Sequence, residues 1–277
     1  MNTLISVAQL AGQLEQASTM VFDCRYALTD PAAGRTAYAR SHIPGAYFVD
    51  MNRDLSTPHV PGKTGRHPLP SKTDWIARVQ SWGLQPEIQV VMYDDNGGAS
   101  AARMWWMLQW IGHSNTAVLD GGWQAWNEAG MPVTAEVPAP RAPSSFDYAA
   151  LRSPAVLVTA SQIDGRSQLL LDARDLPRFR GEVEPIDPVA GHIPGAVCSP
   201  FSANLDAKGK FRSVEELRRK FEGADRFDRP TVCYCGSGIT ACHNILAMTI
   251  AGMPMPALYA GSWSEWITNP ARQIEKG

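Results

Sequence analysis

The sequence has no excess of charge of one sign, since 25 Lys and Arg residues are matched by 27 Asp and Glu residues. Nucleic acids and acidic membrane surfaces attract basic proteins, so neither is expected as a partner. The sequence also lacks an apolar run long enough to span a bilayer, and no basic stretch of a signal peptide opens it. These absences predict a globular protein that stays in the cytoplasm and does not enter a membrane.

Cysteine is scarce and unevenly placed, with only Cys24, Cys198, Cys233, Cys235 and Cys242. An odd number clustered late in the chain is poor material for a disulfide framework and fits a reducing compartment. A metal site built from the last three cysteines and the adjacent histidine is rejected. Structural metal sites of this kind are typically built from Cys-x-x-Cys pairs, and the sequence contains none. We therefore predict no metal.

The 277-residue chain repeats itself. Four segments of its first half have similar counterparts in its second half, in the same order and at offsets of about 140 to 150 residues. The matched pairs are 21–25 with 170–174, 41–46 with 191–196, 90–94 with 231–235, and 121–126 with 261–266. We predict two copies of one domain, over residues 1–133 and 156–277, joined by a proline-rich extended linker over 134–155.

Within each copy, short apolar runs alternate with helical patterns. Ser6 is placed to cap a helix that carries Leu10 and Leu14, and Ser213 with Glu216 has the spacing of a capping box. The runs 90–93 and 231–234 are almost continuously apolar, as in strands buried on both faces. This alternation predicts an α/β fold with a mainly parallel sheet in each copy, whose ligands gather at the carboxyl ends of the strands.

Cys235 is the outstanding candidate for chemistry. It follows the apolar run and precedes Gly236, Ser237 and Gly238, after which a helical pattern starts. Glycines let backbone N–H groups turn toward the sulfur, and the positive end of the next helix favours an anion there. Because the thiolate is the reactive form of cysteine, this environment predicts a nucleophile.

The two copies differ at this position. The repeat places Asp94 opposite Cys235, and the loop that follows Asp94 reads Asp-Asn-Gly-Gly-Ala. A carboxylate cannot replace a thiolate as a soft nucleophile, so only the second copy is expected to be catalytic. The first copy is expected to close the site and to supply side chains to it.

These features together resemble the tandem-domain rhodanese family, whose members transfer sulfur from thiosulfate or 3-mercaptopyruvate. The resemblance rests on both Asp-x-Arg strands, both His-Ile-Pro-Gly-Ala segments, the Cys235 loop and the Gly-x-Trp-x-x-Trp endings. It implies two tandem rhodanese-like domains, each with a five-stranded, mainly parallel sheet flanked by helices. It also implies a persulfide on Cys235, sulfur transfer to cyanide or a thiol acceptor such as thioredoxin, and no organic cofactor.

The loop favours one donor. The sequence Cys-Gly-Ser-Gly-Ile-Thr has no Lys or Arg from 236 to 243 and is similar to the mercaptopyruvate type, whereas basic residues there typify thiosulfate enzymes. By resemblance, Ser237 and His67 join Cys235 as catalytic residues, Arg178 binds the donor carboxylate, and Arg174 orients the site or braces the loop. The remaining residues implied in donor binding are those of the loop, Gly236, Gly238, Ile239 and Thr240.

The sequence departs from the mercaptopyruvate type at two places. Asn52 stands where that type has an acid, with Asp50 and Asp54 nearby, and segment 184–188 lacks the second substrate arginine. Whether His67 works with one of these neighbours in a proton relay is left open, as is the use of thiosulfate.

Two other functions are weighed. A cysteine phosphatase shares this loop geometry but needs an arginine six residues after the cysteine, where this chain has Ala241. A non-catalytic sulfur-binding module fits the first copy, yet the second copy has an intact loop. The matched histidines, His42 and His192, are expected to be structural, because both copies share them. The tryptophan pairs 123/126 and 263/266 have helical spacing and are expected to be core or interface residues.

Overall fold

The computed structural model describes residues 3–222 and 229–277, and it consists of two compact units. The first unit comprises 1–57, 69–154 and 208–210, and the second comprises 58–68, 155–207 and 211–277, with the undescribed residues in these ranges set aside. The segment 58–68 therefore belongs to the unit that contains Cys235, although it lies in the first half of the sequence. Within the described part of the chain, no helix is long and apolar enough to cross a membrane.

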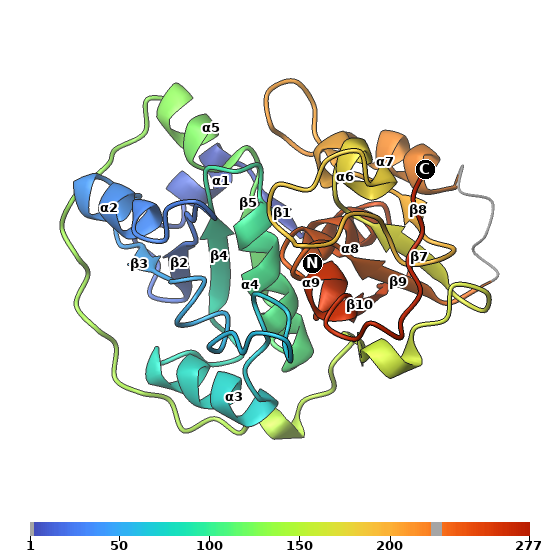
Figure 1. Cartoon of the computed structure of the whole chain (residues 1–277). Coiled ribbons are helices and arrows are strands. Elements are labelled where there is room, and N and C mark those ends of the chain that lie inside the picture. Colours follow the sequence, from blue (N-terminus) through green and yellow to red (C-terminus); the bar gives the residue numbers. More distant parts are fainter. Residues whose placement is uncertain (1–2, 223–228) are drawn as a thin grey trace. The chain divides into compact units, whose positions relative to one another are not determined.

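Each unit contains one five-stranded sheet, and its strands pair in parallel (Figure 1). The first sheet has the order β1 (Leu4–Ile5), β5 (Thr116–Leu119), β4 (Gln89–Tyr93), β2 (Thr19–Asp23) and β3 (Tyr47–Phe48). The second sheet has the order β6 (Leu157–Val158), β10 (Ala257–Tyr259), β9 (Thr231–Tyr234), β7 (Leu169–Asp172) and β8 (Val197–Cys198). The two strand orders are equivalent, so the two halves of the repeated sequence fold with the same topology. The predicted α/β fold is confirmed.

Helices and short 3-10 turns connect the strands of each sheet. Those of the first unit are α1 (Val7–Ala11), α2 (Ala33–Arg40), α3 (Lys72–Ser81), α4 (Ala99–Trp110), α5 (Gly122–Glu128) and η1 (Tyr148–Ala150). Those of the second unit are η2 (Ala160–Gln162), α6 (Leu176–Arg180), η3 (Phe201–Asn204), α7 (Val214–Glu222), α8 (Thr240–Ile250) and α9 (Ser262–Trp266). Helix α4 packs on β4 and β5, and α8 packs on β9 and β10.

The predicted caps are present. Ser6 and Gln9 form a capping box at the start of α1, which buries Leu10 but ends at Ala11, before Leu14. The Ser213 hydroxyl accepts a hydrogen bond from the Glu216 N–H at 3.2 Å, at the start of α7. That helix buries Leu217 and Phe221.

The central strands β4 and β9 are buried almost throughout, which is why their sequences are continuously apolar. Each ends in a buried tyrosine whose hydroxyl accepts a hydrogen bond from the isoleucine of a His-Ile-Pro-Gly segment. The distance is 3.2 Å from Ile43 to Tyr93 and 3.2 Å from Ile193 to Tyr234. The histidines before these isoleucines stack on aromatic rings, His42 on Tyr38 and His192 on Phe179. These motifs hold the ends of the central strands in both units, in keeping with the structural role expected of them.

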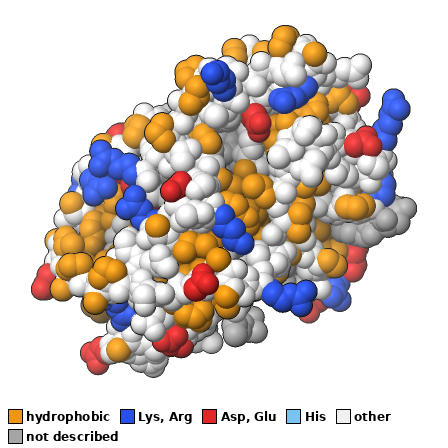
Figure 2. Space-filling model, turned by 90° about the horizontal axis from the view of Figure 1, so that it is seen from below, with side chains coloured by type: hydrophobic (Ala, Val, Ile, Leu, Met, Phe, Trp, Pro, Cys, Tyr) orange, Lys and Arg blue, Asp and Glu red, His pale blue; other side chains and the backbone are white. Residues whose placement is uncertain are grey.

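The proline-rich segment predicted as a linker runs mostly exposed along the first unit as far as Pro154. It contributes short attachments to that unit: Thr134 pairs with His42, the Ser144 N–H donates to the Gln80 carbonyl at 2.8 Å, and Tyr148 is buried. On the face drawn in Figure 2, basic and acidic side chains of the described residues are interspersed, as expected for a net charge of −2.

Candidate active site

Cys235 lies at the carboxyl end of β9, where the chain turns into α8. Its side chain is almost fully buried, and the Gly238 N–H donates a hydrogen bond to its sulfur at 3.1 Å. Ile239 and Thr240 follow as the N-cap and first residue of α8, so the positive end of this 11-residue helix lies at the same loop. The predicted arrangement of strand, glycine loop and helix is present, and it stabilises negative charge on the sulfur.

The first turn of α9 holds this loop in place. The backbone carbonyls of Cys235 and Gly236 accept hydrogen bonds from the N–H groups of Trp263 and Ser264, each at 2.9 Å. The Cys235 N–H donates to the Ser262 hydroxyl at 3.1 Å. Ser262 has a left-handed φ of 56°, the one non-glycine with a positive φ among the described residues. No local pattern in the sequence indicates that Ser262 and the residues after it anchor the loop of Cys235.

Gly238 must be glycine. Its φ is 81°, and a Cβ built on it would lie 2.4 Å from the Ala260 carbonyl oxygen. Only a residue without a side chain can turn here and direct its N–H at the sulfur.

The structure brings two of the predicted catalytic side chains together. Nδ1 of His67 lies 2.8 Å from the hydroxyl of Ser237, and both residues are buried. His67 reaches the loop because segment 58–68 belongs to the second unit. The acids considered as relay partners, Asp50 and Asp54, form hydrogen bonds and ion pairs within the first unit, to Arg35 and Arg78 among others.

Arg178 also lies beside the loop. A Cβ on Gly236 would be 3.6 Å from both terminal nitrogens of its guanidinium. The same guanidinium binds Glu184, with a shortest distance of 2.7 Å, and Asp187 at 3.3 Å. Burial opposes the ionisation of Glu184, but hydrogen bonds from Arg178 and from backbone N–H groups outweigh it and lower the pKa of this carboxyl. Arg178 and Glu184 therefore form a charged pair at neutral pH.

Arg174 is fully engaged elsewhere. Its guanidinium donates to Asp172 at 2.7 Å and to the Gly191 carbonyl at 2.7 Å, and lies 3.4 Å from Glu184. In the first unit Arg25 repeats this pattern with Asp23 and the Ser41 carbonyl. Burial lowers the pKa of Arg174, but the Asp172 carboxylate more than compensates and raises it. A pattern shared by both units supports the bracing interpretation of Arg174.

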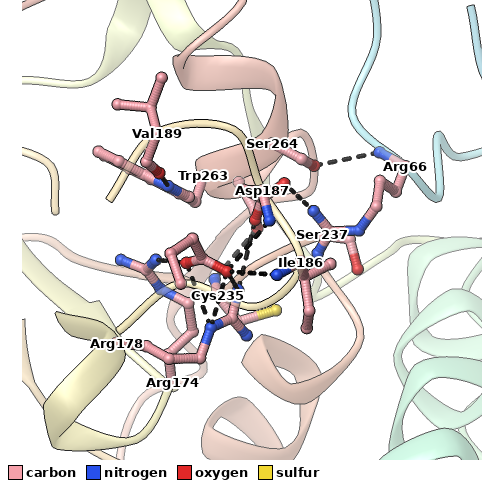
Figure 3. Close-up of polar contacts among 12 residues, drawn as sticks. Arg66, Arg174, Arg178, Ile186, Asp187, Val189, Cys235, Ser237, Trp263 and Ser264 are labelled. Atoms are coloured by element: carbon pink, nitrogen blue, oxygen red, sulfur yellow. Dashed lines mark hydrogen bonds and ion pairs between the residues drawn. The ribbon is translucent and has the colours of Figure 1, made fainter. Parts of the chain in front are cut away.

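Arg66 is the residue that sequence reasoning missed. Its guanidinium pairs with Asp187, and its backbone N–H donates to the Ser264 hydroxyl at 3.1 Å (Figure 3). A Cβ on Gly236 would lie 2.8 Å from its Nη2. The position of Arg66 directly before His67 was the one indication in the sequence that it lies near the site. Nothing in the local sequence indicates that it contacts Asp187 and Ser264, which are more than a hundred positions away.

The other cysteines lie in different environments. Burial raises the pKa of the Cys24 and Cys233 thiols, and it raises that of Cys198 to about 11. The Cys242 thiol donates to the Gly238 carbonyl at 3.3 Å, within the core of α8. Among residues 3–222 and 229–277 no three His, Cys, Asp or Glu side chains are grouped to hold a metal ion.

Comparisons with known proteins show the family to which the chain belongs. The rhodanese-like domain matches residues 6–129 and again 157–269, and the chain therefore belongs to the rhodanese family. The chain is 49% identical to the "Probable 3-mercaptopyruvate sulfurtransferase" of Pseudomonas aeruginosa, over 99% of this chain and 98% of that protein. It is 34% identical to the thiosulfate sulfurtransferase of Gallus gallus, over 95% and 90% of the two chains. The solved structure of 3-mercaptopyruvate sulfurtransferase from Leishmania major superposes with a TM-score of 0.82 at 33% identity, covering 96% of this chain and 74% of that one.

Proposed function

We propose that this protein is a sulfurtransferase that moves a sulfane sulfur from a small anionic donor to cyanide or a thiol, through a persulfide on Cys235. The observation that carries the proposal is the hydrogen bond from the Gly238 N–H to the Cys235 sulfur, at the end of β9. The donor is 3-mercaptopyruvate or thiosulfate, the substrates named for the relatives in Pseudomonas aeruginosa and Gallus gallus. We favour 3-mercaptopyruvate, because the loop from 236 to 243 carries no Lys or Arg.

In the first step the Cys235 thiolate attacks the sulfur that the donor gives up and forms an S–S bond. This is the thiol sulfur of 3-mercaptopyruvate or the outer, sulfane sulfur of thiosulfate. With 3-mercaptopyruvate the C–S bond breaks, and its electron pair passes to the enolate of pyruvate, which then takes up a proton. With thiosulfate the S–S bond of the donor breaks, and the electron pair leaves with sulfite. The backbone N–H of Gly238 and the start of α8 stabilise the negative charge on sulfur before attack.

In the second step the acceptor attacks the outer sulfur of the persulfide. Cyanide leaves as thiocyanate, and the electron pair of the broken S–S bond returns to Cys235 as thiolate. A protein thiol such as thioredoxin would instead leave as a persulfide. A second thiol of the same acceptor can then attack the inner sulfur, which closes a disulfide and releases the transferred sulfur as hydrosulfide. Sulfur is carried on the protein throughout, so the proposed cycle needs no organic cofactor, and the five free cysteines suit a reducing cytoplasm.

We expect the Ser237–His67 pair to affect the reaction with 3-mercaptopyruvate more than the reaction with thiosulfate. The enolate formed from 3-mercaptopyruvate needs a proton, and the hydroxyl of Ser237, hydrogen-bonded to the His67 ring, can donate it. Sulfite leaves without needing one. The pair is therefore proposed to matter for the first donor and to be dispensable for the second.

The test is a cyanide assay with each donor, combined with intact-mass measurement after donor alone. We expect Cys235 to gain the mass of one sulfur atom and to lose it on addition of cyanide. Ser237→Ala should lower kcat with the mercaptopyruvate donor about 100-fold while changing kcat with thiosulfate less than about 10-fold. A wild-type protein that gains no sulfur from either donor refutes the proposed function.

A further inference from the structure

Two guanidinium groups converge on the residue next to the proposed nucleophile. A Cβ on Gly236 would lie 2.8 Å from Nη2 of Arg66 and 3.6 Å from both Nη atoms of Arg178. Gly236 follows Cys235 directly, so both cations lie beside the loop that carries the sulfur. They come from distant parts of the sequence, segment 58–68 and helix α6, but both belong to the second unit.

Arg66 is held in this position by its backbone and by one carboxylate. Its N–H donates to the Ser264 hydroxyl, and its Nη1 pairs with Asp187. The preceding Gly65 passes so close to the α9 turn that a Cβ on it would lie 2.5 Å from the Gly261 carbonyl oxygen. The absence of a side chain at Gly65 therefore lets Arg66 reach the loop.

In the part of the chain that the structure describes, each arginine has a donor nitrogen that its carboxylate partners do not bind. Nε of Arg66 is buried and has no hydrogen-bond partner among the described residues. Arg178 directs Nε and Nη2 to Glu184 and Asp187, while Nη1 bonds to neither. Buried donors are nearly always paired in folded proteins, so an unpaired one beside a nucleophile points to a ligand.

The carboxylates around the site position these cations and balance their charge. Asp172 pairs with Arg174, Glu184 with Arg178, and Asp187 bridges Arg66 and Arg178 at its two oxygens. Three carboxylates therefore face three guanidiniums, which allows the buried site to persist without a net charge. Asp187 therefore contacts both Arg66 and Arg178 (Figure 3).

We propose that Arg66 is a donor-binding residue, and that Arg66 and Arg178 together grip the anionic oxygens of the sulfur donor beside Cys235. This inference rests on the proposed sulfurtransferase function. The ligand chemistry is a planar or tetrahedral oxyanion, which a guanidinium fork recognises. The oxyanion is the carboxylate of 3-mercaptopyruvate or the sulfonate end of thiosulfate, and the two arms of the test separate these sources.

The test compares Arg66→Gln and Arg66→Lys with wild type in the cyanide assay. Arg180→Gln is the matched control, because Arg180 lies in the same unit, is about half exposed and forms an ion pair with Glu182 at 3.6 Å. For each protein the donor KM is measured at saturating cyanide, once with mercaptopyruvate and once with thiosulfate. The cyanide KM is measured at saturating donor.

We expect Arg66→Gln to raise the donor KM about 10- to 100-fold, the range of one charge-assisted hydrogen bond, with the cyanide KM unchanged. Arg66→Lys should give a smaller increase, because it keeps the charge but loses the fork. A larger increase for one donor identifies whose oxyanion Arg66 binds. Arg180→Gln should match wild type.

The inference is overturned if the donor KM of both Arg66 variants stays within about twofold of wild type while wild type is active. It is also overturned if the donor and cyanide KM rise together, since a loosened loop would affect both half-reactions. If Arg66→Gln does not fold, as judged by circular dichroism, Arg66→Lys decides, because it retains the ion pair with Asp187. An inactive wild type would instead refute the proposed function itself.

Discussion

Asp94 and Cys235 occupy the same position in the two sheets. The backbone carbonyl of each accepts a hydrogen bond from a tryptophan N–H that starts the next turn, Trp123 for Asp94 at 2.8 Å and Trp263 for Cys235 at 2.9 Å. The Asp94 carboxylate receives four backbone N–H groups, from Asn96, Gly98, Ser100 and Ala101, at 2.8 to 2.9 Å. The loop after β9 surrounds the Cys235 thiol, whereas the equivalent loop after β4 surrounds the Asp94 carboxylate. The N–H groups of the loop in the first unit are therefore already bound to a side chain of the protein.

The first prediction concerns this loop of the first unit. Asp94→Ala should lower the free energy of unfolding by about 3 kcal/mol, because it leaves four backbone N–H groups, three of them buried, without an acceptor. Asp94→Asn keeps an acceptor oxygen and should cost less. Urea unfolding at pH 7 measures both, and equal stability of Asp94→Ala and wild type would contradict the assigned role of this carboxylate.

A second prediction concerns thiol reactivity. Iodoacetamide should modify Cys235 before the other four cysteines, because Gly238 and α8 stabilise its thiolate while burial raises the pKa of the Cys24, Cys198 and Cys233 thiols. Peptide mapping after brief labelling at pH 7 gives the order. Cys235→Ser should fold normally and retain less than about a tenth of the sulfur transfer of wild type. Faster labelling of any other cysteine would contradict the conclusion that the loop after β9 stabilises the Cys235 thiolate.

A third prediction concerns Gly238. Replacing it by Ala forces a side chain into a left-handed backbone conformation and against the Ala260 carbonyl oxygen. We expect a loss of about 1–3 kcal/mol in stability and slower labelling of Cys235, because the N–H can no longer reach the sulfur. Gly209→Ala is the control, since Gly209 has the same backbone conformation, with a φ of 71°, but open space around it. Gly209→Ala should lower the stability less than Gly238→Ala, and the labelling rate of Cys235 in this variant should equal that of wild type.

A fourth prediction concerns acid stability. His113 is buried in the first unit, with Nε2 3.1 Å from the Ile88 carbonyl oxygen and Nδ1 3.3 Å from the Tyr148 hydroxyl. Desolvation lowers its pKa from 6.5 to about 4. Between these values the unfolded chain binds more protons than the folded one, so stability falls as the pH drops from 6.5 toward 4, by up to about 3 kcal/mol.

Urea unfolding of wild type and His113→Gln at pH 7 and pH 5 tests this dependence. The variant should be less stable at pH 7 but should lose less stability between the two pH values. An identical loss in both proteins would show that other groups cause the acid sensitivity.

The fold could be predicted largely from the sequence because its signals are local. Continuous apolar runs produce strands buried on both faces, and capping residues such as Ser6 and Ser213 mark helix starts. The ordered repeat then requires two sheets of one topology. The Asp94–Cys235 correspondence followed from the same alignment, and the structure places both residues at the ends of equivalent central strands.

The sequence by itself therefore determined the repeat, the nucleophile and the turn chemistry around it, because each depends on residues close together in the chain. Only the tertiary structure decided which distant side chains meet at Cys235. Segment 58–68 joins the second unit, so His67 meets Ser237 and Arg66 meets Asp187. Likewise, the turn at Ser262 anchors the loop through hydrogen bonds between residues some thirty positions apart. Such pairings depend on how the chain packs, and no local pattern of residues encodes them.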